Sequence, residues 1–182
     1  MHIRVTPKFF LEDPWRLEGW GITHVISIQE SADYGKESKK YPTPPWVESY
    51  NHHRFYFDDV TNEYNHQLTA ATMEDIVKIA ECGRKLPEDS TVLVHCHAGV
   101  SRSPAVALGI LAVRYGLEEG WKQWLKIPGN LNFWPNELVV QMFDDYLGSN
   151  NFLYDKVRQW KKDEKDRLAE RGVKLLLPFD DE

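Results

Sequence analysis

The chain has 182 residues, of which 42% are hydrophobic and 27% are charged, as in an ordinary globular protein. One main domain is expected, because domains usually hold about 100 to 200 residues. The sequence contains no run of the roughly 20 apolar residues that a membrane span needs, and its first residues lack the apolar core of a signal peptide. The net charge of −6 disfavours nucleic acid as a partner, since binding to many phosphates requires a basic surface.

Before residue 90, runs of apolar and β-branched residues predict strands, and apolar residues at helical spacing predict helices. In chain order, the predicted elements are an edge strand at 3–5, a short helix at 13–20, a buried strand at 21–28, a loop at 31–47, a strand at 53–57 and a helix at about 68–86. The loop is predicted from Gly35 and from three prolines.

After residue 90, the same patterns predict a strand at 91–94, helices at 105–112, 118–125 and 135–147, and a charged helix at 151–171. Strands that alternate with helices are typical of an α/β fold with a central, mostly parallel sheet flanked by helices. We expect residues 1–148 to form the main domain. Residues 149–182 are predicted to form a charged helical extension that packs on this domain or on a partner.

One segment between a predicted strand and a predicted helix carries both a nucleophile and a fixed positive charge. Cys96 and Arg102 stand at its two ends, and Pro104 opens the helix. Backbone N–H groups at a helix N-terminus have no partner within the helix, and the helix dipole adds partial positive charge there. The segment is therefore predicted to bind an oxyanion such as phosphate and to favour the thiolate form of Cys96.

The residue types in this segment suit phosphoryl transfer. The Cys96 thiolate can attack phosphorus and form a cysteinyl-phosphate. The Arg102 guanidinium can bind two phosphate oxygens at once, and Gly99 lets the backbone turn its amides inward. The hydroxyl of Ser103 can stabilise the thiolate as it leaves, and the ring of His95 can order the loop through hydrogen bonds.

The segment resembles the signature of the cysteine-dependent protein tyrosine phosphatases, most closely that of the small dual-specificity phosphatases. The resemblance rests on His95-Cys96, Ala98-Gly99 and Ser101-Arg102-Ser103, and it extends over about residues 3–147. It implies that residues 1–148 are a phosphatase catalytic domain that needs no metal and no cofactor. It also implies that phosphate is bound by five loop residues: His97, Ala98, Gly99, Val100 and Ser101.

Two further features follow from this resemblance. The family has a Pro-Asn pair before a later helix, here Pro135-Asn136, which implies that Asn136 braces the loop; capping of the helix is its alternative role. The family also places a general acid after an earlier strand, where this chain has Asp58 and Asp59. The family pattern favours Asp59, and Asp58 is the alternative. Because side chains alternate along a strand, only one of the two can face the loop, and the plainer interpretation is that both are exposed turn residues.

The loop at 31–47 is a candidate for substrate recognition, because ligands of open α/β sheets bind beyond the carboxyl ends of the strands. Side chains that would frame the rim of the site are Tyr34, Lys36, Lys39, Lys40 and Trp46. An ordinary surface loop explains the same residues equally well.

Together these features predict a phosphatase that acts on phosphorylated proteins, on phosphotyrosine first and on phosphoserine and phosphothreonine if the cleft is shallow. An RNA 5′-phosphatase, a phosphoinositide phosphatase and a non-catalytic phospho-ligand binding module are the alternatives. Related phosphoinositide phosphatases often carry lysines within the loop, and residues 97–101 contain none. We expect a monomer in the cytoplasm, away from membranes, since a catalytic Cys96 must stay reduced.

Overall fold

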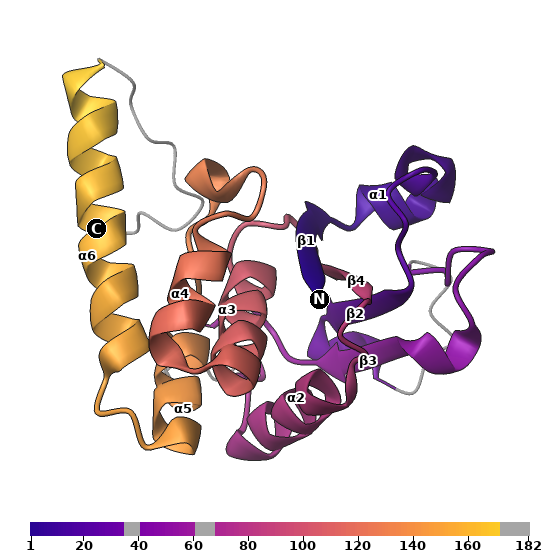
Figure 1. Ribbon diagram of the computed structural model, residues 1–182, viewed down its shortest axis with the longest axis horizontal. Helices are drawn as coiled ribbons and strands as arrows, with labels where there is room; N and C mark the ends of the chain where they lie inside the picture. The colour runs from indigo at the N-terminus through magenta and orange to yellow at the C-terminus, as the bar shows by residue number, and fades with distance from the viewer. Residues whose placement is uncertain (35–40, 61–67, 172–182) are drawn as a thin grey trace.

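The computed structural model describes residues 1–34, 41–60 and 68–171, and its centre is a parallel sheet. The sheet has four strands in the order β1-β4-β2-β3: β1 (His2–Pro7), β2 (His24–Gln29), β3 (His52–Tyr56) and β4 (Thr91–Cys96). Each neighbouring pair is parallel, so the carboxyl ends of the strands meet at one edge (Figure 1). The expected α/β fold with a central parallel sheet is therefore confirmed.

The longer helices lie on one side of the sheet, some against the strands and the others against those helices (Figure 1). They are α2 (Met73–Lys85), α3 (Arg102–Tyr115), α4 (Leu117–Trp124), α5 (Glu137–Leu147) and α6 (Phe152–Glu170). Alternate strand residues such as Ile26 and Val94 point into this layer, where they join Ile79 and Leu108 in the main hydrophobic core. α3 is the central helix, and its residues 102–112 are all buried. Within the described residues, no helix combines the length and the apolar character needed to cross a membrane.

The other face of the sheet is covered by short segments instead of long helices. These are α1 (Phe9–Glu12) and 3₁₀ helices at Pro14–Leu17, Ser31–Asp33 and Ser49–Asn51; a further 3₁₀ helix lies at Asn130–Asn132. Val25 and Leu93 point to this face and pack with Leu11, Leu17 and Tyr41 in a second, smaller cluster. The two faces of the sheet therefore have separate cores, one under helices and one under loops.

The helix predicted at residues 13–20 is wrong in form and position. α1 ends at Glu12, and Pro14–Leu17 forms a 3₁₀ helix. Between them, Asp13 has a non-helical backbone (φ −127°, ψ 79°), because the α region is disfavoured for a residue that precedes proline. Gly19 then adopts a φ of +82°, which an α-helix cannot contain.

Helix α2 begins after the predicted residue 68 because Thr72 caps it. The hydroxyl of Thr72 accepts a hydrogen bond from the backbone N–H of Asp75 (3.2 Å), and the Asp75 carboxylate accepts one from the backbone N–H of Thr72 (2.9 Å). This reciprocal pair is a capping box, which fixes the first turn of a helix. The other predicted strands and helices are present with shifted boundaries.

Helix α6 packs on the main domain. Its residues Leu153 and Val157 are fully buried in the main core, and the ring of Trp160 lies edge-on to that of Trp124 in α4, with 5.3 Å between centroids. The carboxylate of Asp144 in α5 accepts hydrogen bonds from the backbone N–H groups of Leu153 (3.0 Å) and Tyr154 (2.8 Å) at the start of α6. Of the extension predicted at 149–182, the part from 172 onward lies outside the described residues.

Candidate active site

The loop that follows β4 surrounds the sulfur of Cys96 with hydrogen-bonding groups. Cys96 is the last residue of β4 and is almost fully buried, and α3 begins at Arg102. The backbone N–H of Gly99 donates a hydrogen bond to Cys96 Sγ (3.3 Å), and the hydroxyl of Ser103 lies 3.2 Å from the same atom. Donors directed at sulfur stabilise negative charge there, so this geometry suits a thiolate nucleophile.

Gly99 allows the loop to lie directly against the end of β1. It has a φ of +73°, which favours glycine, and a Cβ atom at this position would lie 2.5 Å from the backbone nitrogen of Pro7. The backbone N–H of Lys8 also donates a hydrogen bond to the carbonyl oxygen of His97 (3.1 Å). The end of β1 and the residue after it therefore support the loop through backbone contacts.

Groups at the carboxyl ends of β2 and β3 hold Arg102 in place. Its Nη1 donates hydrogen bonds to the carbonyl oxygens of Phe57 (2.7 Å) and Gln29 (3.4 Å), and its Nη2 donates to Glu30 Oε1 (3.1 Å). Its Nε, in contrast, has no hydrogen-bond partner among the described residues. Burial alone would lower the pKa of Arg102, but the neighbouring Cys96 and acidic side chains raise it above its usual value. The guanidinium is thus fixed and charged, with one buried donor left for an oxyanion.

Glu30 belongs to this site although the sequence analysis did not select it. It follows the last residue of β2 and accepts hydrogen bonds from Arg102 and, at Oε2, from the hydroxyl of the buried Tyr41 (3.0 Å). Burial would raise the pKa of Glu30, but Arg102 and Tyr41 lower it below its usual value. The signal that could have found Glu30 is its position directly after a buried strand. It lies at the edge of the sheet that also carries residues 97–101, which we call the phosphate loop after their predicted role.

The two carboxylates after β3 have different surroundings. Asp58 faces away from the loop and accepts hydrogen bonds from the backbone N–H of Ser31 (3.1 Å), the hydroxyl of Ser31 (2.5 Å) and the backbone N–H of Thr69 (2.8 Å). Burial would raise the pKa of Asp58, but these hydrogen bonds lower it. Asp58 therefore ties three segments together, and its lowered pKa keeps it ionised, so it has no proton to give to a substrate.

Asp59 lies against the phosphate loop. Its Oδ1 accepts hydrogen bonds from the hydroxyl of Ser101 (2.6 Å) and from the side-chain amide of Asn136 (2.8 Å), and its Oδ2 lies 4.0 Å from Arg102 Nε. Of the two carboxylates, Asp59 is the one beside the loop, and its Oδ2 accepts no hydrogen bond from the described residues. This geometry agrees with the role that the family resemblance implies for Asp59.

Asn136 combines both roles considered for it. Its Oδ1 accepts a hydrogen bond from the backbone N–H of Val139 (3.0 Å), which caps α5, while its Nδ2 donates to Asp59 and to the carbonyl oxygen of Val60 (3.0 Å). The backbone N–H of Asn136 also donates to the carbonyl oxygen of Ser101 (3.1 Å). One residue thus joins the start of α5 to the phosphate loop and to Asp59.

The ring of His95 connects the loop region to a buried polar chain that crosses the sheet. His95 Nε2 lies 2.5 Å from the Ser27 hydroxyl, which lies 2.6 Å from His52 Nε2, and His52 Nδ1 contacts Thr43 and Arg54. Burial lowers the pKa of His95 to about 3, and burial with nearby positive charge lowers the pKa of His52 to about 3. His95 is therefore neutral at neutral pH, and it braces β4 against β2 as well as preceding the loop.

The remaining predicted site residues belong to the loop after β4 and to the proposed recognition loop. His97, Ala98 and Val100 lie in the loop after β4, and the exposed ring of His97 lies 3.5 Å from Glu30. In the proposed recognition loop, Tyr34 packs edge-on against Tyr56, and Trp46 packs near Trp15. Lys36, Lys39 and Lys40 lie outside the described residues.

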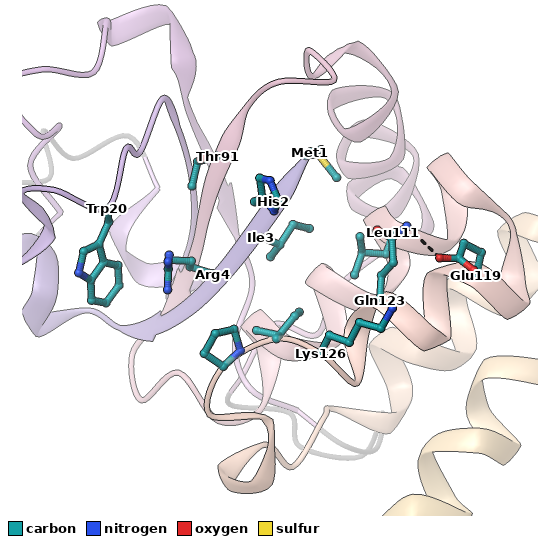
Figure 2. Close-up of a pocket in the computed structure, with 12 residues that line it drawn as sticks. Met1, His2, Ile3, Arg4, Trp20, Thr91, Leu111, Glu119, Gln123 and Lys126 are labelled. Carbon is teal, nitrogen blue, oxygen red and sulfur yellow. Dashed lines mark hydrogen bonds between the residues drawn. The ribbon is translucent and has the colours of Figure 1, made fainter.

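A cavity of about 730 Å³ lies at the other end of the sheet (Figure 2). Its lining includes His2 and Thr91, the first residues of β1 and β4, whereas Cys96 is the last residue of β4. Figure 2 shows Arg4 and Trp20 on one side of the cavity and Glu119 on the other. In the part of the chain that the structure describes, no group of three or more metal-ligand side chains gathers, either here or at the loop.

Comparison with known proteins gives structural relatives only. No family model matches the sequence. No curated protein matches it either. Among solved structures, the human tyrosine phosphatase-like serine/threonine/tyrosine-interacting protein is 18% identical, with a TM-score of 0.58 over 80% of this chain and 91% of that chain. The Cydia pomonella PTP-2 phosphatase is 17% identical, with a TM-score of 0.56 over 80% of this chain and 85% of that chain.

A third relative is PTPMT1, solved in complex with PI(5)P. It is 16% identical, with a TM-score of 0.51 over 88% of this chain and 94% of that chain. Dual-specificity phosphatases from mouse and human share the same fold at similar identity. The chain therefore has the fold of the cysteine-dependent protein tyrosine phosphatases of the dual-specificity type, as the resemblance of its loop implied.

Proposed function

We propose that this protein is a phosphatase that hydrolyses phosphate monoesters of phosphorylated proteins, with Cys96 as the nucleophile. The observation that carries the proposal is the meeting of three groups at one loop. Cys96 Sγ accepts a hydrogen bond from Gly99, the Nε of the buried Arg102 has no hydrogen-bond partner among the described residues, and the Asp59 carboxylate lies 4.0 Å from that Nε. A nucleophile, an oxyanion-binding fork and an acid are the parts that phosphoryl transfer through a covalent intermediate needs.

In the first step, the Cys96 thiolate attacks phosphorus in line with the leaving oxygen. The S–P bond forms as the P–O bond to the substrate breaks, and the Asp59 carboxyl group gives its proton to the leaving oxygen. Arg102 and the backbone N–H groups of residues 97–101 bind the three other phosphate oxygens and stabilise the charge that spreads over them. The product alcohol or phenol then leaves.

In the second step, water attacks the phosphorus of the cysteinyl-phosphate. The Asp59 carboxylate takes a proton from that water, the S–P bond breaks, and inorganic phosphate is released. The hydroxyl of Ser103, 3.2 Å from Cys96 Sγ, donates a hydrogen bond to the thiolate as it leaves. Asp59 returns to its protonated state, so the cycle is closed.

Phosphotyrosine in proteins is the first proposed substrate, with phosphoserine and phosphothreonine next. The fold shared with dual-specificity phosphatases supports this class. A phosphoinositide is the second candidate, because a neighbour of the same fold, PTPMT1, was solved with PI(5)P. The absence of lysine from residues 97–101 favours the protein substrate.

The test is hydrolysis of p-nitrophenyl phosphate by the wild type and by Cys96→Ser, with a metal chelator present, followed by a panel of phosphotyrosine, phosphoserine and phosphothreonine peptides. We expect Cys96→Ser to lose turnover and to keep binding of phosphate esters, since serine is a much weaker nucleophile here and the loop amides are retained. Turnover that survives in Cys96→Ser would exclude the covalent mechanism. An inactive wild type that still binds phosphopeptides would make the protein a phospho-ligand binding module.

A further inference from the structure

Helix α6 brings two lysines to one aromatic ring beside the phosphate loop. The ammonium groups of Lys161 and Lys165 lie 5.1 Å and 5.4 Å from the ring centroid of Trp134. The two lysines are four residues apart, so they lie on the same face of the helix. Cation–π contacts at these distances hold both charges over one indole.

Trp134 is tied to the phosphate loop through its backbone. Its N–H donates a hydrogen bond to the carbonyl oxygen of Val100 (2.8 Å), and two residues later Asn136 bonds to both Ser101 and Asp59. The ring that carries the two lysines is therefore part of the segment that closes the loop on the side of Asp59. Because Asp59 protonates the leaving oxygen, this is the side on which the rest of the substrate lies.

The two lysines have different states. Lys161 is 8% exposed and pairs with Glu137 Oε1 at 2.8 Å. Burial lowers the pKa of Lys161, while Glu137 and Asp59 oppose that change. Lys165 is exposed and has no ion pair among the described residues. The pair therefore keeps one net positive charge after Glu137 is counted, and it belongs to Lys165.

We infer that Lys165, supported by Lys161 on the ring of Trp134, forms a second anion-binding subsite beside the phosphate loop. The subsite would hold a second negative group of a phosphopeptide, either a carboxylate side chain or another phosphate close to the one removed. This inference rests on the proposed function and names the substrate class more narrowly.

The test compares kcat/KM for two phosphotyrosine peptides that differ only in their flanking residues, Asp and Glu in one and Asn and Gln in the other. In the wild type we expect the acidic peptide to be preferred. Lys165→Gln should reduce this preference about fivefold, the size of one exposed charge pair, and Lys165→Glu should reduce it further. Lys162→Glu, on the same helix and outside the ring contact, is the matched control and should leave the preference unchanged. A second phosphate in place of the carboxylates should give the same pattern.

Binding separates a failure of this inference from a failure of the proposed function. In the Cys96→Ser background, calorimetry with the acidic and neutral phosphopeptides measures the subsite without any turnover. A Lys165→Glu change that weakens both peptides equally, or neither, would overturn the subsite. A lysine dependence found only with a soluble phosphoinositide headgroup would overturn the peptide assignment. An inactive wild type whose acidic-peptide binding still depends on Lys165 would refute the phosphatase function and keep the subsite.

Discussion

The carboxyl end and the amino end of the sheet both carry charged side chains, but they hold them differently. At the carboxyl end, Arg102 is bonded to groups from β2 and β3, and Asp59 to groups from the loop and α5. At the amino end, the charges around the cavity have local partners: Glu119 accepts a hydrogen bond from Gln123 one turn away, and Arg4 stacks on Trp20. The cavity of about 730 Å³ therefore lies at the end where the charged side chains are held more loosely.

A cavity by itself is therefore a poor guide to chemistry in this molecule. A reacting group needs a fixed position and a fixed charge, and both come from hydrogen bonds between segments that are distant in sequence. Among the described residues, the side chains of Arg4, Glu119 and Lys126 at the amino-end cavity make no hydrogen bond to a segment that is distant in sequence.

The largest expected effect comes from the two neighbouring carboxylates. Asp59→Asn should lower the rate of hydrolysis by about 10²- to 10⁴-fold, because the leaving oxygen loses its proton donor. Asp58→Asn should lower the rate much less, but it should cost about 1–3 kcal/mol of unfolding free energy, because the amide cannot accept all three hydrogen bonds that the carboxylate accepts. Steady-state kinetics and urea denaturation of both variants measure the two effects. The reverse order of rates would move the acid to Asp58.

The next prediction compares the change in kcat when one arginine at each end of the sheet is replaced by lysine. Arg102→Lys should lower kcat by about 10²- to 10³-fold, since the lysine ammonium cannot reproduce the fork that binds phosphate oxygens. Arg4→Lys, at the amino-end cavity, serves as the control and should leave kcat near that of the wild type. Equal losses in the two variants, measured with p-nitrophenyl phosphate at saturation, would mean that the charge acts at long range and not through the loop.

The smallest effect is on stability and comes from the buried chain of His95 and His52. Both have pKa values near 3 in the folded state, against an ordinary value of 6.5, so the unfolded chain binds more protons between these limits. Their contribution to stability is therefore complete above about pH 6.5 and is lost as the pH falls toward 3. At pH 5.5 the loss for the two together is about 3 kcal/mol. Urea denaturation at pH 7.5 and 5.5 measures it, and His52→Gln should remove about half. A pH dependence unchanged by His52→Gln would contradict the assignment.

Much of the architecture follows from local sequence pattern. The strands ending at Tyr56 and Cys96 and the long helices are predictable because their apolar residues recur at the period of each structure. The prediction of a helix at 13–20 was wrong because the spacing of apolar residues does not account for backbone geometry. Pro14 disfavours the helical conformation at Asp13, and Gly19 adopts a positive φ. The start of α2 was available from Thr72 and Asp75, which have the spacing of a capping box.

The site was only partly predictable, because a motif identifies residues within one segment but does not show which distant residues contact them. Cys96 and Arg102 lie within one short segment, so their spacing in sequence reflects their spacing in space. Glu30 is distant from that segment and meets Arg102 only because β2 and β4 end at the same edge of the sheet, and Tyr41 joins the site through its hydrogen bond to Glu30. Lys161 and Lys165 in α6 could not be selected from the sequence, since nothing in their own segment shows that α6 passes over Trp134.

Because Gly99 packs closely on Pro7, the end of the first strand constrains the shape of the phosphate loop. Since the loop backbone takes its shape from the end of β1, any force that draws β1 away from β4 would also release the loop from its working form. β1 is one of the two edge strands of the sheet, so another chain could pair with it. A partner bound at the amino-terminal strand would therefore act on the chemistry of the loop through backbone contacts alone.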